Sequence, residues 1–131
     1  MLKIMKPALA GTALVCLLLT PALARRAHAQ VLPKGDPVAG KTLYQACMGC
    51  HSIDENDIGP KHRGVVGRKA GIIPGYAYSA ALKNSGIVWT PEKLNGWLTN
   101  PQKLVPGAKM FFSVSNPKQR ADIIAYLATQ K

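Results

Sequence analysis

Two cysteines and a histidine lie close enough in this sequence to share one chemical task. The segment Cys47-Met48-Gly49-Cys50-His51 places two thiols three residues apart, with an imidazole directly after the second thiol. Thiols at this spacing lie on one turn of the chain, and each can add to a vinyl group of the same porphyrin. The pattern is the attachment signature of a c-type haem, in which the following histidine coordinates the iron. We therefore expect one covalently attached haem c, with Cys47 and Cys50 as thioether residues and His51 as an axial ligand.

Three other interpretations of the motif are weaker. A thioredoxin-like redox pair uses the same cysteine spacing, but it belongs in a βαβ setting that this chain lacks. A structural zinc site would need four ligands, for which the candidates are Cys47, Cys50, His51 and His62. The adjacent Cys50 and His51 are poorly directed for one tetrahedron, and no second C-x-x-C pair is present. The third interpretation is chance, against which the N-terminal place of the motif and the signs of export below both argue.

The second axial position of the iron has one good candidate among the remaining Met and His residues. Met48 lies in the spacer of the motif and faces the wrong way to reach across the ring. His62 is expected to be a loop histidine in contact with solvent. Met110 follows a Pro106-Gly107 turn, from which a loop can fold back over the haem. Its soft thioether sulfur favours reduced iron, so we expect Met110 as the ligand rather than as a gap-filling core residue.

The first 29 residues differ in composition from the rest of the chain, since they contain no Asp or Glu, and they predict a secretory signal. Lys3 and Lys6 precede an apolar run over residues 8–19, and small residues suit cleavage after Ala29. The alternative is an uncleaved membrane anchor. Its apolar stretch is short for a bilayer, contains Gly, Thr and Pro, and is followed by two arginines on the side that would be translocated.

Cleavage would leave a domain over residues 30–131, which we expect in the periplasm without stable membrane insertion. This part carries 13 Lys and Arg against 6 acids, a formal charge of +7. A chain of this size builds only a modest apolar core, so a large covalently bound group would add what the core lacks. Basic runs are short and no aromatic residues interleave with them, which argues against nucleic-acid binding.

The elements that must position these side chains are predicted to be helices. Three of them begin with a capping residue followed by proline, at Asp36-Pro37, Thr90-Pro91 and Asn116-Pro117. A shorter helix is expected over residues 78–84. Residues 58–75 and 101–107 are dense in Gly and Pro and predict irregular loops, and no stretch alternates well enough for a sheet. The fold class is therefore all-α with long loops.

With these elements the chain resembles the class I cytochromes c, the small soluble mono-haem electron carriers of mitochondria and bacteria, over nearly all of residues 35–131. The matching residues outside the motif are Gly40, Tyr44, Gly59-Pro60, Gly64, Gly67-Arg68-Lys69, Tyr78, Trp89, Asn100-Pro101, Pro106-Gly107, Lys109-Met110 and Ala125-Tyr126-Leu127. The resemblance implies the small cytochrome c fold, in which three main helices plus one or two short ones, with long loops, wrap around the haem. It also implies that Gly40 lets the first and last helices cross closely, with Tyr44 and Tyr126 packed at the crossing.

The resemblance implies further roles beside the haem. The carbonyl of Pro60 is expected to accept a hydrogen bond from His51 and so fix the orientation of the imidazole. Three side chains are expected to hydrogen-bond or neutralise the haem propionates: Tyr78, Trp89 and Arg68.

Three positions depart from the family pattern. Trp97 stands where the family often has a tyrosine whose hydroxyl reaches the methionine sulfur, and Leu82 and Ala108 stand where polar side chains are common. We therefore expect fewer hydrogen bonds than usual on the Met110 side.

An iron with both axial positions filled by the protein implies one-electron transfer and no enzymatic activity. The expected partners are redox proteins with acidic docking faces, such as a quinol-oxidising cytochrome complex, a terminal oxidase or a dehydrogenase, met by a monomer. The basic residues expected around the exposed haem edge are Lys41, Lys61, Lys103, Lys109 and Lys118. Two alternatives stay open: a haem enzyme or gas- or peroxide-binding protein with an open sixth site, and a haem subunit of a larger dehydrogenase.

Overall fold

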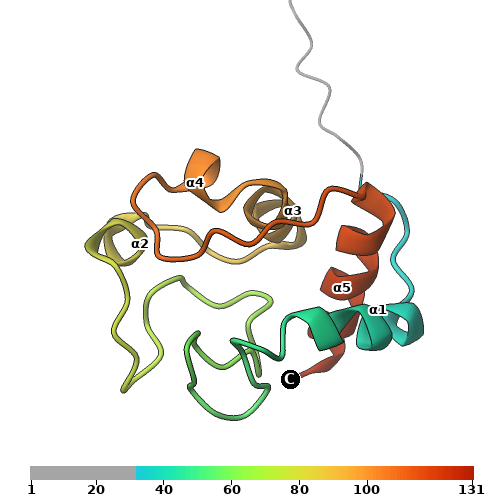
Figure 1. Cartoon of the computed structure of the whole chain (residues 1–131), viewed down its shortest axis with the longest axis horizontal. Coiled ribbons are helices and arrows are strands. Elements are labelled where there is room, and N and C mark those ends of the chain that lie inside the picture. Colours follow the sequence, from blue (N-terminus) through green and yellow to red (C-terminus); the bar gives the residue numbers. More distant parts are fainter. Residues whose placement is uncertain (1–31) are drawn as a thin grey trace, which may run out of the picture.

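Short helices joined by long loops make up the part of the chain that the structure describes. The computed structural model describes residues 32–131, so the signal predicted for residues 1–29 lies outside it. The elements are α1 (Pro37–Leu43), the 3-10 turn η1 (Tyr44–Ala46), α2 (Ala80–Asn84), α3 (Pro91–Thr99), α4 (Pro101–Leu104) and α5 (Pro117–Thr129). Within these residues there is no strand, only an isolated bridge between Lys69 and Val88, and no helix is long and apolar enough to cross a membrane. The prediction of an all-α fold with long loops is confirmed (Figure 1).

Side-chain caps start the helices where the sequence predicted them. Asp36 accepts a hydrogen bond from the backbone N–H of Val38 at 2.8 Å, and Thr90 and Asn116 begin α3 and α5 in the same way. Each cap satisfies an N–H that the first turn would leave without a partner. The short helix predicted over residues 78–84 is α2, which starts two residues later because Ser79 is its cap.

One expected loop contains a helix. Residues 101–107 were predicted to be irregular, but the first four of them form α4. Asn100 accepts a hydrogen bond from the N–H of Lys103 at 2.9 Å, and Pro101 occupies the first helical position. The prediction is wrong because a single turn is too short to show helical periodicity, although its cap and proline repeat the signal of the longer helices.

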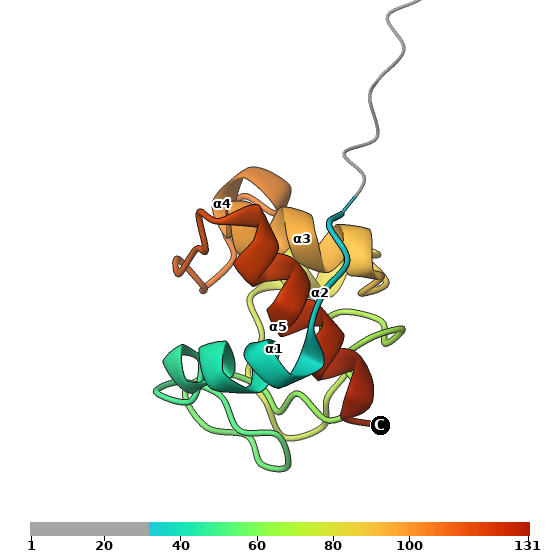
Figure 2. The ribbon, with the colours of Figure 1, turned by 90° about the vertical axis from the view of Figure 1, so that its right-hand side faces the viewer.

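The first and last helices of the described chain cross in close contact, as Figure 2 shows. Gly40 makes the crossing possible, because a Cβ at this position would lie 1.9 Å from the carbonyl oxygen of Asp122. Beside the crossing, the rings of Tyr44 and Tyr126 pack with centroids 5.2 Å apart, and the N–H of Asp36 donates to the Asp122 carboxylate at 2.6 Å. The close crossing and the tyrosine packing that the resemblance implied are both confirmed.

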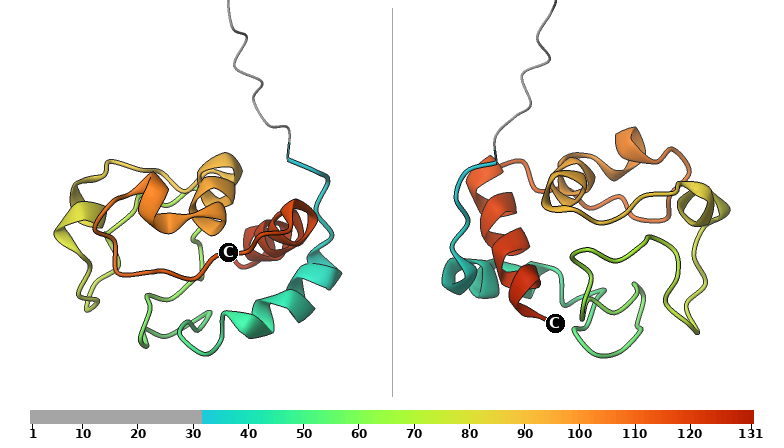
Figure 3. Two further views of the ribbon diagram at one scale, coloured as in Figure 1. Left: turned by 45° about the horizontal axis from the view of Figure 1, so that its top comes forward. Right: turned by 180° about the vertical axis from the view of Figure 1, so that it is seen from behind.

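The remaining elements form two facing parts that meet α5 at one end. Figures 1 and 3 show α2, α3 and α4 on one side and the long loop that follows η1 on the other. The α3 stripe of Leu94, Trp97 and Leu98 is buried and packs toward α5, where Ile123 and Ile124 belong to the same apolar cluster. This arrangement leaves an internal space between the two parts, and the functional residues face it.

Candidate haem site

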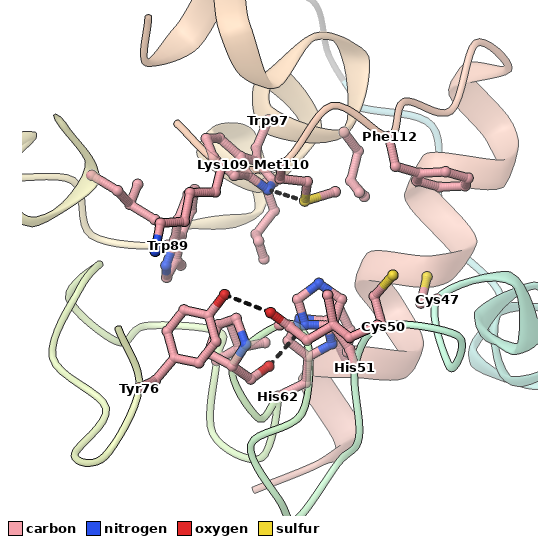
Figure 4. A pocket seen from close by; sticks show the side chains of 18 of the residues that line it. Cys47, Cys50, His51, His62, Tyr76, Trp89, Trp97, Lys109, Met110 and Phe112 are labelled. Carbon is pink, nitrogen blue, oxygen red and sulfur yellow. Dashed lines mark hydrogen bonds between the residues drawn. The ribbon is translucent and has the colours of Figure 1, made fainter. Parts of the chain in front are cut away.

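A cavity of about 540 Å³ lies between the α3–α4 side and the long loop. All seven residues that the sequence predicted to contact the haem or its iron line this cavity, and so does Pro60, the predicted partner of His51. Figure 4 shows Cys50 and His51 on one side of it and Trp97 and Met110 on the opposite side. The fold therefore collects residues that are up to 63 positions apart in the sequence around one apolar space.

The two cysteines sit on a turn that continues the first helix. After η1, the N–H groups of Cys50 and His51 both donate to the carbonyl of Cys47, at 3.1 and 2.9 Å, which turns the chain back on itself. Both thiols are free, and burial raises the pKa of Cys47 to about 11. A thiol with such a pKa is protonated at neutral pH, unlike the thiolate of a reactive redox pair. In the described part of the chain, no three His, Cys, Asp or Glu side chains are grouped to hold a metal ion, so the candidate zinc ligands are not gathered.

His51 is oriented by a backbone carbonyl. Its Nδ1 lies 2.8 Å from the carbonyl oxygen of Pro60, which can only accept, so Nδ1 carries the proton and Nε2 keeps its lone pair. The neighbouring Gly59 leaves room for the ring, because a Cβ there would lie 2.2 Å from Cε1 of His51. Burial lowers the pKa of His51, which keeps the imidazole neutral and able to coordinate a metal.

His62 is not the solvent-facing loop residue that the sequence suggested. Its ring stacks on His51 with centroids 4.1 Å apart, and its Nδ1 lies 2.9 Å from the hydroxyl of Tyr44. The loop folds under Tyr44 because the N–H of His62 donates to the carbonyl of Ser52 at 2.9 Å. Burial lowers the pKa of His62 to about 3, so the ring is neutral at physiological pH. Because the His62 ring stacks on His51, it lies on the same side of the cavity as His51 and cannot act as the ligand on the opposite side.

Met110 has a hydrogen-bond donor of its own. The indole Nε1–H of Trp97 donates to the sulfur of Met110 at 3.1 Å (Figure 4). The expectation of fewer hydrogen bonds on this side is therefore wrong for the sulfur, because an indole N–H can take the place of a tyrosine hydroxyl. Leu82 does line the cavity as an apolar residue, and the carbonyl of Ala108 accepts a hydrogen bond from the Gln102 side chain at 2.7 Å.

The three residues predicted to meet the propionates also line the cavity. Arg68 is fixed by hydrogen bonds to the carbonyls of Arg63 and Lys61, at 2.7 and 2.9 Å. Burial raises the pKa of Tyr78, so its hydroxyl stays protonated and can donate; the positive charge of Arg68 opposes part of this rise. Trp89 is buried as well. A cation and two neutral donors that line the same cavity suit anionic groups.

The sequence did not reveal three further residues at this site. The hydroxyl of Tyr76 donates to the carbonyl of Ile58 at 2.7 Å and closes the loop side of the cavity. Phe112 lies near Met110 on the wall opposite the cysteines (Figure 4). Gln102 bonds the segment that carries Met110. Phe112 had a weak signal in its closeness to Met110, whereas nothing in the sequence marked Tyr76 or Gln102.

The residues present fit a covalently bound porphyrin. The cavity is large and mainly apolar, two free thiols lie at one edge, a lone pair of an oriented imidazole is available on one side, and a thioether sulfur lies on the other. The close approach at Gly59 keeps the space beside the imidazole free of a side chain.

Comparisons with known proteins identify the family of this chain. Residues 37–131 match the family model described as cytochrome c. Cytochrome c2 of Rhodopila globiformis is 52% identical over 103 residues, which are 76% of this chain and 97% of the relative. Cytochrome c2 of Rhodomicrobium vannielii is 41% identical over 133 residues and covers 98% of both chains. The solved structure of cytochrome cH from Methylobacterium extorquens has a TM-score of 0.71 at 49% identity, covering 72% of this chain and 99% of that one. The chain therefore belongs to the cytochrome c family of haem-bearing electron carriers.

Proposed function

We propose that the protein is an exported mono-haem cytochrome that carries single electrons between redox partners, with His51 and Met110 as the two axial ligands of the iron. Cys47 and Cys50 would hold the haem through thioether bonds. The observation that carries this proposal is the placement of the Met110 sulfur across the cavity from the imidazole of His51, each held by its own hydrogen bond. Both ligand types suit iron, and the thioether favours its reduced form.

The chain's own residues prepare the site for this task. When bound, haem c supplies a reversible one-electron couple. The Pro60 carbonyl fixes the tautomer of His51, and the Trp97 indole orients the Met110 sulfur. Because these groups are set before any electron arrives, little has to move when the charge changes. The positive charge of Arg68 would neutralise the negative propionates. The hydroxyl of Tyr78 and the indole N–H of Trp89 would donate hydrogen bonds to them.

A sixth position filled by Met110 leaves no room for a substrate, which supports an electron carrier rather than an enzyme. A haem enzyme, or a protein that binds gas or peroxide, would need this position open or easily vacated. The hydrogen bond from Trp97 and the tethers of the Met110 segment both act against such an opening.

The charge pattern supports partners with acidic faces. Residues 93–121 carry five Lys and Arg and no acid, whereas three of the six acids gather at residues 54–57 in the loop on the His51 side. Two of the lysines expected around the exposed haem edge already have partners: Lys109 donates to the carbonyl of Ala77 at 2.5 Å, and Lys118 pairs with Asp122. Lys41 and Lys103 are exposed, and we expect them to contribute most to docking. Association with an acidic redox partner should weaken as salt is added.

Export to the periplasm rests on the signal predicted for residues 1–29 and has a direct test. The protein is expressed with its whole sequence in a bacterium that assembles c-type cytochromes, and the N-terminus of the haem-bearing product is sequenced. We expect cleavage after Ala29 and recovery in the periplasmic fraction. Retention of the segment with recovery in the membrane fraction would favour an anchor.

Optical spectra of the purified holoprotein test the electron-carrier proposal. The oxidised protein should show the weak far-red band typical of methionine bound to iron(III), and carbon monoxide should bind the reduced protein poorly. The band should vanish in Met110→Ala. The matched control is Met48→Ala, since Met48 is half-exposed in the motif spacer and should leave the band unchanged. A wild-type protein without the band that binds carbon monoxide freely would instead favour a haem enzyme or sensor.

A further inference from the structure

The segment that presents Met110 has few backbone ties. No backbone N–H of residues 109–113 donates a hydrogen bond to any group in the described part of the chain. Farther along, the Arg120 guanidinium donates to the carbonyls of Val114 and Ser115, at 2.7 and 2.8 Å. A segment with so few backbone hydrogen bonds belongs to the least stable parts of a protein, and the side chains that tether it decide how often it opens.

At the other end of this segment, Lys109 bonds the carbonyl of Ala77 and Trp97 bonds the Met110 sulfur. Among the described residues, only the Gln102 side chain bonds several backbone groups there. The amide nitrogen of Gln102 donates to the carbonyl oxygens of Ala108 and Met110, at 2.7 and 2.9 Å. The amide oxygen of Gln102 accepts from the N–H of Gly107 at 3.3 Å. A single amide therefore bonds three backbone groups within four residues, and one of these groups is the carbonyl of Met110 itself.

Gln102 is well placed to act as an anchor because its own backbone is fixed. It lies in α4, whose first residue, Pro101, is fully buried and whose start is capped by the Asn100 side chain. The Gln102 side chain is itself partly buried, which shields its bonds from competing water. The anchor is rigid while the segment that it holds is loosely tied, so loss of the amide should free the segment rather than the helix.

We propose that Gln102 is a positioning residue that holds residues 107–110 closed over the cavity and so sets how often Met110 leaves it. The inference rests on the proposed function in that it takes Met110 as the ligand. Each lost hydrogen bond lowers the stability of the closed segment by a modest amount, and the bonds of Gln102 together should change the opening equilibrium about 10- to 100-fold.

The test compares holoproteins that carry Gln102→Leu or Gln102→Ala with wild type. Leucine keeps most of the side-chain volume and removes all three hydrogen bonds, while alanine removes the packing as well. The matched control is Asn56→Ala, because Asn56 is also a loop-tethering amide. It donates to the carbonyl of Pro74 at 3.0 Å and accepts from the N–H of Lys61 at 3.1 Å, away from the Met110 segment.

Two readouts are measured on each protein. The first is binding of imidazole to the oxidised iron, which requires Met110 to leave and should be favoured about 10- to 100-fold by both Gln102 variants. The second is amide hydrogen exchange of Gly107 by NMR, which should speed up by a similar factor. Asn56→Ala should leave both readouts at their wild-type values.

The outcomes separate this inference from the proposed function. Unchanged imidazole binding and unchanged Gly107 exchange in the Gln102 variants would overturn it, as would equal effects of Asn56→Ala. If the wild-type iron lacks methionine ligation, the proposed function fails. Faster Gly107 exchange in the Gln102 variants would still support the tether in that case, whereas unchanged exchange would remove it too.

Discussion

Replacing Trp97 by phenylalanine tests the role of the indole N–H at the Met110 sulfur. The substitution removes the hydrogen bond of 3.1 Å from Nε1 and keeps an aromatic ring on α3. In the proposed ligation the Met110 sulfur would share its lone-pair density between the indole proton and the iron. Without the indole proton it would be a better donor to iron(III), which would stabilise the oxidised state more than the reduced one. The reduction potential of the holoprotein should therefore fall.

The size of the fall follows from the strength of the bond. The net contribution of a hydrogen bond to stability is about 0.5–1.5 kcal/mol. Because a thioether is a weak acceptor, we expect loss of this bond to change the free-energy difference between the two oxidation states by roughly 0.5–1 kcal/mol. For one electron, tenfold in the equilibrium constant corresponds to about 59 mV, which converts this difference to a decrease of about 20–40 mV. Spectroelectrochemical titration at constant pH and salt resolves such a change.

A control separates the hydrogen bond from general loosening of the core. Ile124 is buried on α5 but does not line the cavity, so Ile124→Val should lower the free energy of unfolding by about 0.5–1.5 kcal/mol and leave the potential unchanged. A potential in Trp97→Phe that stays constant or rises would refute the reasoning, as would an equal fall in Ile124→Val.

Three further predictions concern packing, acid stability and haem attachment. Gly40→Ala should destabilise the fold by about 3 kcal/mol or more in denaturant unfolding, because its Cβ would lie 1.9 Å from the carbonyl oxygen of Asp122. Burial lowers the pKa of His62 to about 3, from its ordinary 6.5. The unfolded state therefore binds a proton that the folded state refuses, and stability should fall by about 1.4 kcal/mol per pH unit once the pH drops below about 6.5. His62→Leu should flatten this dependence between pH 6.5 and 4 in denaturant titrations. Cys47→Ser should retain at most one thioether bond, shown by the absorption of the reduced pyridine complex after denaturation.

Each of these has a clear contrary result. An unchanged unfolding free energy in Gly40→Ala would mean that the two helices can separate without loss. Parallel pH profiles for wild type and His62→Leu would show that this ring is not held neutral. A pyridine-complex spectrum of Cys47→Ser identical to that of wild type would remove this thiol from the attachment site.

Much of the scaffold could be predicted because its signals are local. A capping side chain with a proline at the first helical position marks the start of α1, α3 and α5, and the structure confirms all three. The same signal precedes α4, where one turn gives no apolar stripe to support it. The residues of the attachment motif could be found for the same reason, since their chemistry depends on a spacing that is visible in the chain.

The inner details of the site could not be predicted because they depend on tertiary contacts. His62 is chemically an ordinary loop histidine until the loop folds it under Tyr44 and against His51. The donor at the Met110 sulfur is Trp97, 13 residues away in the sequence, although the sequence predicted fewer hydrogen bonds than usual on this side. Gln102 carries no pattern at all, because its role arises only when residues 107–110 fold back over it.

The crossing of α1 and α5 has a consequence for how the chain folds. The hydrogen bond between Asp36 and Asp122 joins residues 86 positions apart, so the contact that closes the fold also closes a loop of nearly the whole domain. The entropy of such a closure grows with loop length, and contacts of this separation form slowly. A haem bound at Cys47 and Cys50 early in the chain and met by Met110 late in it would divide this loop into shorter ones. The prosthetic group would then lower the entropy cost of bringing α1 and α5 together, because each of the shorter loops costs less to close than the long one.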